Sequence, residues 1–362
     1  MSKKLPITIA SWDYDRIRPI KDGTVPVEGC DVTYITTRPE ETFFRLFTYQ
    51  EFDVSEMSFS SYMLARTNID FPYIALPIPI SRVFAHSGIF IRTDRGIKRP
   101  EDLKGKIVGA PNYQLTRGLC IRGTLSDEYG VKPQHLKWRI GGLDVPEFLD
   151  YVPQEPPKGV EIEPIKPGQT LSAMLADGEI DAIFTAQTPL CWREKRPKIA
   201  RLFANPREAE MAYFKKTGIF HIMHLIGMRK SLAEQYPWLP RAIMKAFEEA
   251  KALTQPHLTE VTAYVTMLPW LAYEAEATMA AMGEDYWPYG IERNVKTIDA
   301  QIRWSYEQGL SKKLWKKEEL FHPATFTWFR SDRPGLSSSK ATDASLAKWK
   351  KGQGPTMGVK RK

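Results

Sequence analysis

The sequence predicts an α/β protein of two lobes, each a mixed sheet flanked by helices, joined by two crossover strands. Three observations support this fold class. The chain has 362 residues, enough for two separate cores. Short β-like and helical runs alternate and are joined by short connections, which is typical of α/β folds. A helix-to-strand junction occurs twice, as Glu51-Phe-Asp-Val and as Glu179-Ile-Asp-Ala, and each strand leads into a Ser- or Thr-containing loop.

The first α/β unit begins with two strands, predicted over residues 6–10 and 31–36. A helix is expected over 39–49, because aromatic and leucine residues recur at helical spacing and carboxylates occupy its first turn. Residues 51–62 then supply the next strand and a helix start.

The second unit repeats this order. Residues 99–114 predict a short helix ended by Gly105, a strand at 106–109 and another helix start. Residues 170–178 predict an amphipathic helix ended by glycine, and the strand 179–186 follows it.

Two β-rich runs, 81–92 and 218–229, are predicted to cross between the units, which makes the first lobe discontinuous. The stretch 146–168, rich in Pro, Glu and Lys, is expected to be a surface excursion. Further helices are predicted at 237–254, 260–264, 272–282 and 292–307. The predicted division is residues 1–88 plus 225–330 for lobe 1, 89–224 for lobe 2 and 331–362 for a flexible basic tail.

Composition excludes several classes of protein. Hydrophobic residues make up 43% and charged residues 26%, as in ordinary globular proteins. No apolar run approaches the ~20 residues of a membrane span, so no membrane partner is expected. Of the formal net charge of +8, residues 331–362 carry +6, from six Lys, two Arg and two Asp, and the remainder carries +2. Since basic tails are usually solvated, we expect no nucleic-acid partner.

The cysteines and the N-terminus indicate a cytoplasmic protein. Cys30, Cys120 and Cys191 are odd in number and widely spaced, which fits neither a disulfide framework nor a zinc site. The apolar stretch after Lys3 and Lys4 is too short for a secretory signal, and we interpret it as a first strand. The sequence also lacks a P-loop, a GxGxxG helix start and a Gly-x-Ser-x-Gly elbow, and no metal or organic cofactor is expected.

Polar clusters follow the predicted strands, where open α/β sheets bind ligands. Asp13, Asp15 and Arg16 follow the first strand, although either carboxylate could instead cap a helix. Ser60 and Ser61 lie at a helix start that suits a bound carboxylate or ordinary capping.

Arg82, Phe84 and His86 share one face if the first crossover is a strand throughout, so that Arg82 and His86 would face the cleft. In the return strand, His221 and His224 are three apart and point to opposite faces. A zinc pair is therefore not expected, and at most one of them faces the cleft.

A further group of polar residues is predicted in the second lobe to bind substrate: Asn112, Tyr113, Gln114, Thr116 and Thr185.

These segments resemble the 4,5-dihydroxyphthalate decarboxylase family over about residues 5–325. The resemblance is carried by Tyr14-Asp-Arg, Phe52-Asp-Val-Ser-Glu-Met-Ser-Phe-Ser-Ser-Tyr, Ser81-Arg-Val-Phe-Ala-His-Ser, Gly109-Ala-Pro-Asn-Tyr-Gln and Gly218-Ile-Phe-His-Ile-Met-His. It implies a fold like that of type II periplasmic solute-binding proteins. One departure is His221, where a proline-like residue is expected, and it concerns the substrate rather than the fold.

The resemblance implies release of CO₂ from a hydroxylated aromatic dicarboxylate, with a small aromatic carboxylate as the partner. We hypothesise that His86 or His224 donates the proton, that Arg82 and Arg16 hold the remaining carboxylate, and that Asp13 or Asp15 orients the histidine or accepts the phenol proton. The alternative is a solute-binding protein that holds such an anion without changing it. A homo-oligomer is compatible with the sequence.

Overall fold

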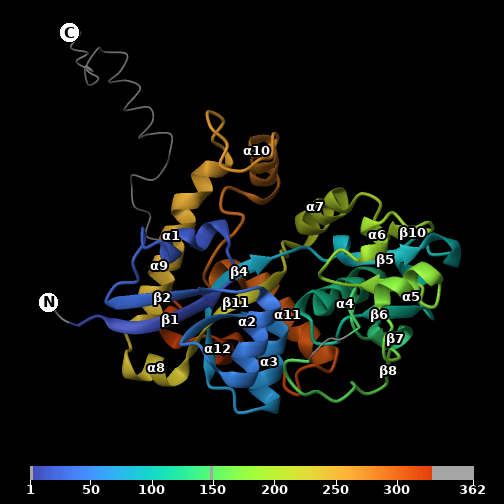
Figure 1. Ribbon diagram of the computed structural model, residues 1–362, viewed down its shortest axis with the longest axis horizontal. Coiled ribbons are helices and arrows are strands. Elements are labelled where there is room, and N and C mark those ends of the chain that lie inside the picture. Colours follow the sequence, from blue (N-terminus) through green and yellow to red (C-terminus); the bar gives the residue numbers. More distant parts are fainter. Residues whose placement is uncertain (1–2, 147–149, 328–362) are drawn as a thin grey trace, which may run out of the picture.

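The computed structural model describes residues 3–146 and 150–327 and contains two mixed sheets, each flanked by helices (Figure 1). This architecture confirms the predicted fold class. The first sheet has the strand order β2-β1-β3-β11-β4. Its strands are β1 (Leu5–Ser11), β2 (Cys30–Thr36), β3 (Val54–Ser58), β4 (Tyr73–Arg82) and β11 (Ile222–Arg229). Strand β1 is parallel to both neighbours, and β11 is antiparallel to both of its own.

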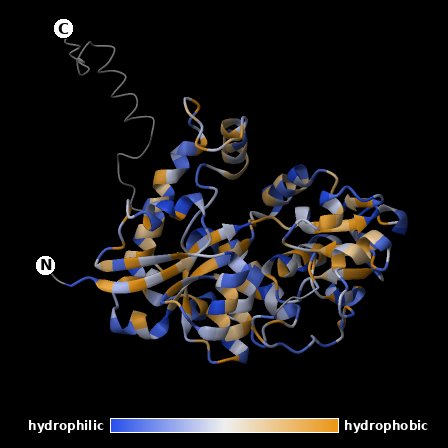
Figure 2. Ribbon diagram, in the orientation of Figure 1, coloured by the Kyte–Doolittle hydropathy of each residue, from blue (hydrophilic) through white to orange (hydrophobic). Residues whose placement is uncertain are grey.

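The second sheet has the order β10-β5-β9-β6-β7-β8. Its strands are β5 (Ile89–Arg92), β6 (Ile107–Ala110), β7 (Lys137–Ile140), β8 (Glu161–Pro164), β9 (Ala182–Phe184) and β10 (Ile199–Arg201). Strands β4, β6 and β9 are largely buried and mainly hydrophobic, as expected for layers covered by helices, whereas the edge strands β2, β8 and β10 are more exposed (Figure 2).

The helices before the return strand are α1 (Arg18–Lys21), α2 (Pro39–Phe44), α3 (Phe59–Asn68), α4 (Thr116–Tyr129), α5 (Leu171–Asp177), α6 (Leu190–Arg193) and α7 (Pro206–Thr217). Those after it are α8 (Lys230–Gln235), α9 (Leu239–Thr254), α10 (Leu271–Met282), α11 (Val295–Glu307) and α12 (Lys317–Leu320). A π-helical turn, η2 (Arg45–Tyr49), extends α2. Short 3₁₀ turns are η1 (Asp15–Ile17), η3 (His86–Gly88), η4 (Thr93–Arg95), η5 (Pro100–Leu103), η6 (Pro133–His135), η7 (Gln255–Leu258), η8 (Glu292–Asn294) and η9 (Pro323–Thr325).

Local sequence explains where these elements begin and end. The Thr170 hydroxyl accepts a hydrogen bond from the Ala173 N–H at 3.3 Å and caps α5, which ends at Gly178 with a φ of 84°. The helices predicted at 39–49, 170–178, 237–254, 272–282 and 292–307 are confirmed within a few residues. None of the helices in the described ranges has the length and apolar character that crossing a bilayer demands.

Two local predictions are wrong, and a third, the surface excursion, is incomplete. Residues 260–264 form bends instead of a helix, in a stretch whose β-branched Val261, Thr262 and Val265 disfavour helices. The stretch 146–168 contains β8, a mostly exposed edge strand whose polar residues conceal its pairing with β7. The first crossover is not one continuous strand, because β4 ends at Arg82, opposite Ile222, and His86 starts a 3₁₀ turn.

Two crossings link the sheets, one from β4 to β5 and one from α7 to β11, as predicted. The sheet contents agree with a discontinuous first lobe, but the exact lobe boundaries stay a prediction. The predicted basic tail, 331–362, lies outside the described residues.

We call each sheet with its flanking helices one half of the molecule. Helix α4 of the second half packs against α11 of the first half, so the two halves share buried contacts. A Cβ added at Gly123 of α4 would lie 2.2 Å from the Trp304 ring of α11. Only glycine permits this close approach of the helix backbone to the indole. All three cysteines are buried and free, as the sequence predicts for reduced thiols.

Candidate functional site

The strand directions of the first sheet bring four chain segments to one edge. Strands β1, β3 and β4 end at Ser11, Ser58 and Arg82, and the antiparallel β11 begins at Ile222 on the same side. This is the carboxyl edge of the parallel strands, which faces the second sheet (Figure 1). The polar residues that follow these strands therefore gather between the two halves.

A fully buried glutamate lies at the centre of this edge. The side chain of Glu56 in β3 has no exposed surface. Its Oε1 accepts hydrogen bonds from the Tyr14 hydroxyl at 2.7 Å and from Nδ1 of His224 at 2.6 Å. Its Oε2 accepts from the backbone N–H of Trp12 at 2.9 Å. Three donors from two other chain segments, the loop after β1 and strand β11, thus converge on one carboxylate.

The hydrogen bonds determine the charge of this glutamate. Burial by itself raises the pKa of Glu56, but the hydrogen bond and charge of His224, together with Trp12 and Tyr14, outweigh it and lower the pKa below its usual value. Burial and the neighbouring Glu56 raise the pKa of Tyr14, so its hydroxyl stays protonated and donates.

An ionised carboxylate can only accept, so Nδ1 of His224 carries the hydrogen in this pair. That leaves Nε2 as the free position of the ring, and no hydrogen bond to it is formed by the described residues. The ring lies edge-on to the Phe43 ring, with 4.8 Å between the ring centroids, and the His224 side chain keeps 19% of its surface exposed. His224 is therefore oriented on one side and accessible on the other.

Arg16 lies next to this group. Its guanidinium is stacked between the rings of Tyr14 and Trp287, at 4.2 Å and 4.5 Å from their centroids. Its Nε donates to the Ile80 carbonyl at 2.9 Å, and Nη1 meets the Asp15 carboxylate at 3.1 Å. The stacking holds a cation beside Tyr14 with 15% of its side chain exposed.

Arg82 is more deeply placed than Arg16. Its guanidinium donates to the carbonyls of Phe220 at 2.8 Å and Pro288 at 3.1 Å and to the Asn294 side chain, and only its Nε lacks a partner among the described residues. Burial lowers the pKa of Arg82 to about 9.

Two further arginines, the buried Arg122 and the partly buried Arg117, bond to neutral groups. Burial lowers the pKa of Arg117 to about 10 and also lowers that of Arg122. In the part of the chain that the structure describes, neither these two nor Arg82 forms an ion pair with a carboxylate. These three guanidinium groups are therefore not neutralised by a direct ion pair in the described part of the chain.

Asp13 and Asp15 lie toward the surface. Asp13 pairs with Arg18 at 3.4 Å and Lys21 at 3.3 Å, and Asp15 pairs with Arg16. Neither aspartate bonds to a histidine, and the carboxylate in contact with His224 is that of Glu56.

The predicted serines and threonine form a buried hydroxyl cluster that joins the two halves. Thr116 at the start of α4 lies 3.0 Å from the Ser58 hydroxyl and 2.9 Å from the Ser60 hydroxyl, both at the start of α3. Ser58 also donates to Ser61 at 3.0 Å, and Ser60 donates to the Gln114 carbonyl.

The other predicted residues of the second half are buried and bonded locally. The Gln114 side chain donates to the Val152 carbonyl at 2.8 Å, and Thr185 accepts from the Gln187 N–H at 3.1 Å. Asn112 accepts from the Leu115 N–H at 2.8 Å, while its Nδ2 and the Tyr113 hydroxyl have no partner among the described residues.

His86 and His221 are both buried in an aromatic environment. The His86 ring contacts Phe203 and Tyr213, and burial lowers the pKa of His86 to about 4. His221 lies 3.2 Å from the Thr124 hydroxyl, and burial lowers its pKa to about 3. Both rings are therefore neutral near pH 7.

The sequence of this chain is similar to those of known enzymes. The 4,5-dihydroxyphthalate decarboxylase of Comamonas testosteroni is 39% identical over 327 residues, which cover 90% of this chain and 99% of that protein. The chain belongs to the 4,5-dihydroxyphthalate decarboxylase family. The enzyme of the same name from Pseudomonas putida is 39% identical over 212 residues, 59% of this chain and 82% of that protein. The chain is thus a member of a family of enzymes. No family model matches the sequence.

Solved structures of similar fold include the periplasmic aliphatic sulphonate-binding protein SsuA from Escherichia coli. Its TM-score is 0.49 at 13% identity, over 89% of this chain and 92% of that one. The desulfurization enzyme DSZB has a TM-score of 0.47 at 11% identity, over 89% of this chain and 98% of that one.

In this member of the decarboxylase family, sequence reasoning missed Glu56 as a site residue. The sequence shows only a glutamate within a predicted strand; that all five residues of this strand are buried, so that the glutamate needs hydrogen-bonding partners, is seen in the structure. In the described ranges, no cluster of three or more His, Cys, Asp or Glu side chains is arranged to hold a metal ion.

Proposed function

We propose that this protein decarboxylates 4,5-dihydroxyphthalate to protocatechuate and CO₂, as the names of its relatives suggest. The structural observation that carries the proposal is the contact between His224 and Glu56. It supplies a histidine with a fixed tautomer and one free ring nitrogen at the edge where α/β sheets bind ligands.

The chemistry defines what the site has to provide. A proton adds to the ring carbon that bears the departing carboxylate, and the hydroxyl para to it stabilises the resulting cation. The bond to the carboxylate then breaks, its electron pair returns to the ring, and CO₂ leaves. The site needs a proton donor and a cation for the carboxylate that stays.

His224 takes the donor role in this proposal. Protonated at Nε2, it transfers that proton to the ring carbon, while Glu56 stabilises the imidazolium form through Nδ1. Tyr14 and the Trp12 N–H hold Glu56 in place for this task. His86 is a weaker candidate, because its ring is buried among aromatic side chains and its pKa is too low for it to hold a proton near pH 7.

Arg16 is proposed to bind the carboxylate that remains. It is the arginine beside Tyr14 that keeps an exposed edge, and a guanidinium binds a carboxylate through two parallel hydrogen bonds. Arg82 is more deeply buried than Arg16 and supports anion binding by its charge. Cationic groups without a carboxylate partner, such as Arg82, suit a substrate with two carboxylates.

Closure of the two halves is proposed to exclude water from the reaction. The Gln187 side chain, after β9, donates to Glu40 of α2 at 2.8 Å and so bridges the halves beside the site. Both side chains are polar and accessible enough to exchange this bond for water on opening.

A direct assay tests the proposal. Purified protein is incubated with 4,5-dihydroxyphthalate, and CO₂ and protocatechuate are quantified, with His135→Gln as a control for a histidine in a distant 3₁₀ turn. We expect turnover in the parent and the control and its loss in His224→Gln. Binding of the substrate without CO₂ release would instead identify a solute-binding protein.

The location and assembly of the enzyme also stay predictions. We propose a cytoplasmic location, which is supported by three buried cysteines that are all free. Cell fractionation tests the location, and light scattering of the purified protein tests whether it forms a homo-oligomer.

A further inference from the structure

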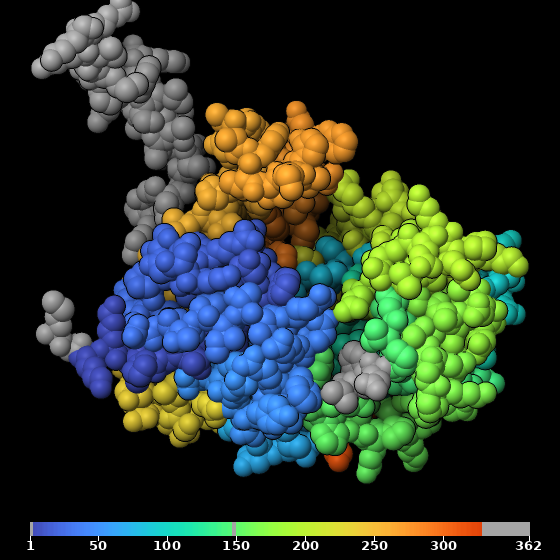
Figure 3. Space-filling model, in the orientation of Figure 1, coloured from blue at the N-terminus to red at the C-terminus, as the bar shows by residue number. Residues whose placement is uncertain are grey.

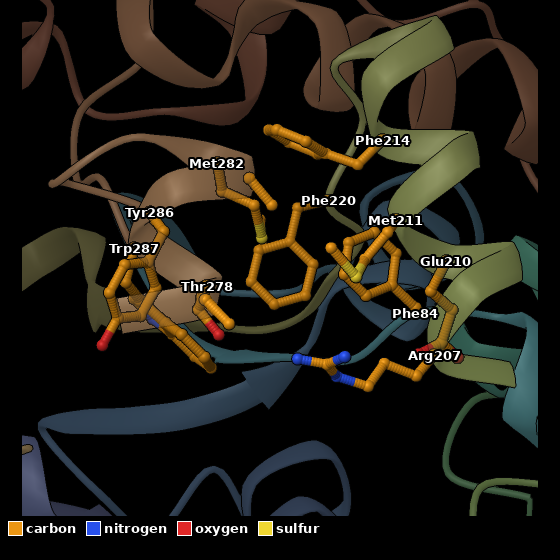
Figure 4. Close-up of a pocket in the computed structure, with 12 residues that line it drawn as sticks. Phe84, Arg207, Glu210, Met211, Phe214, Phe220, Thr278, Met282, Tyr286 and Trp287 are labelled. Atoms are coloured by element: carbon orange, nitrogen blue, oxygen red, sulfur yellow. The ribbon is translucent and has the colours of Figure 1, made fainter. Parts of the chain in front are cut away.

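A cavity of about 250 Å³ lies between α7 and α10, over the two crossing segments. Figure 3 shows a recess in this region, between the orange α10 and the yellow-green α7. Phe84 and Phe220 from the two crossings form its base, and Trp287 and Phe214 form its sides (Figure 4). Trp287 also stacks on Arg16, so the cavity adjoins the candidate site.

The cavity has the size and walls for one aromatic ring. An apolar cavity of about 150 Å³ is enough for benzene, so this one admits a ring with substituents. Phe84 and Phe220 stack at 4.5 Å with 27° between their planes, and Trp287 meets Phe220 edge-on at 5.5 Å. These faces and edges suit a planar ligand.

Besides the hydroxyls of Thr278 and Tyr286, the cavity lining carries one guanidinium and one carboxyl group, those of Arg207 and Glu210. Arg207 and Glu210 are three residues apart on α7 and so share a side of the helix. In Figure 4 the Arg207 guanidinium extends below Phe220 toward Thr278 on the opposite wall.

The present partners of these two groups leave them able to bind a ligand. Arg207 pairs with Glu274 at 3.1 Å, but both side chains are more than half exposed, and such exposed pairs are weak. A ligand carboxylate can therefore replace Glu274. Glu210 accepts from the Ser87 N–H at 3.1 Å, which fixes it at the cavity wall, and burial raises its pKa.

We infer that this cavity binds a hydroxybenzoate with a single carboxylate, the class of the reaction's product rather than of its dicarboxylate substrate. The carboxylate binds Arg207, the ring lies among the aromatic walls, and ring hydroxyls bond to Glu210. A second carboxylate on the ligand would lie close to Glu210, which disfavours the substrate. The inference rests on the proposed function for the choice of ligand.

Titration calorimetry of the full chain tests the inference with protocatechuate, catechol and benzoate. Catechol lacks the carboxylate and benzoate lacks the hydroxyls, so each probe reports on one of the two polar groups. We expect Arg207→Gln to weaken protocatechuate and benzoate at least tenfold and to leave catechol unchanged. Glu210→Gln should weaken protocatechuate and catechol and leave benzoate unchanged.

Matched variants separate a site effect from a general one. Arg193 is a surface arginine of the same 56% side-chain exposure as Arg207, also in a single ion pair, and Arg193→Gln should bind like the parent. Ala277→Trp fills the cavity and should abolish binding of all three probes. Ala280→Trp, on the same helix but outside the lining, should not.

Two results would overturn the inference. One is protocatechuate affinity within twofold of the parent in Arg207→Gln, Glu210→Gln and Ala277→Trp. The other is equal loss of affinity in the Arg193→Gln and Ala280→Trp controls. His224→Gln keeps the two proposals distinguishable, since it should lose turnover and keep this binding. Binding in the cavity by a parent that releases no CO₂ would contradict the proposed function alone.

Discussion

Oε1 of Glu56 accepts hydrogen bonds from both His224 and Tyr14, so one buried oxygen joins the return strand β11 to the loop after β1. The pairing of β3 with β11 sets this geometry, because His224 lies opposite Ser58 in the antiparallel register. A carboxylate with no exposed surface thereby gains three donors, which stabilises its ionised form.

Replacing Glu56 by glutamine should lower kcat by roughly 10²-fold or more with a smaller change in KM. The amide keeps the shape but loses the charge that favours the imidazolium form of His224. Steady-state kinetics on the proposed substrate measure this. Glu51→Gln, an exposed glutamate paired with Arg45, is the matched control and should retain parental kinetics. An undiminished kcat in Glu56→Gln would remove Glu56 from the mechanism.

Arg16→Ala should raise KM about tenfold or more and affect kcat less, because the cation proposed to bind the remaining carboxylate is lost. Arg16→Lys should recover only part of this loss, since an ammonium group cannot make the bidentate contact or stack flat between Tyr14 and Trp287. Arg18→Ala serves as the control, because Arg18 is 61% exposed and pairs with Asp13. Equal KM values in Arg16→Ala and the parent would contradict this role.

His86 should make the protein less stable as the pH falls from 6.5 to 4. The unfolded chain protonates this histidine near its ordinary pKa, whereas burial holds the pKa in the folded state at about 4. The unfolded state therefore binds more protons in this interval, and the free energy of unfolding decreases with falling pH. Between pH 6.5 and 4.5 the contribution is on the order of 2 kcal/mol.

The His86→Phe variant tests this contribution by urea unfolding at pH 7 and pH 4.5. Relative to the parent, it should gain stability at pH 4.5 compared with pH 7. His135→Phe, at a site with no comparable burial, should show no such gain. An identical pH dependence in the parent and His86→Phe would refute the prediction.

Thr116→Val should destabilise the protein by about 1–3 kcal/mol, because it removes the buried hydrogen bonds of the Thr116 hydroxyl to Ser58 and Ser60. These two serines then keep Ser61 and the Gln114 carbonyl as partners. Ser60→Ala should cost less when Thr116 is already Val, since the two hydroxyls bond to each other. Chemical unfolding of both single variants and the double variant gives this coupling. Additive effects of the two substitutions would show that the cluster does not join the halves energetically.

The sequence allowed prediction of the elements whose signals are local. Helix α5 was predictable because Gly178 marks its end. Helix α9 was predictable because its own sequence is amphipathic. The 260–264 helix failed because helical spacing was not weighed against β-branched residues. Strand β8 was missed because an edge strand keeps the polar composition of a loop.

The candidate site was less predictable, because it depends on register. Glu56 and His224 are 168 residues apart and meet only through the pairing of β3 with β11. The end of β4 at Arg82 likewise depends on where its partner strand begins, which separates Arg82 from His86. Sequence alone identified His224 and Arg16 as candidates, but not the carboxylate that orients the histidine.

The close approach of Gly123 to Trp304 constrains how the molecule moves. Moving α4 away from α11 would uncover the Trp304 ring and leave an empty space beside the Gly123 backbone, which costs free energy. We therefore expect an opening motion that keeps this contact and breaks the single polar bond from Gln187 to Glu40 instead.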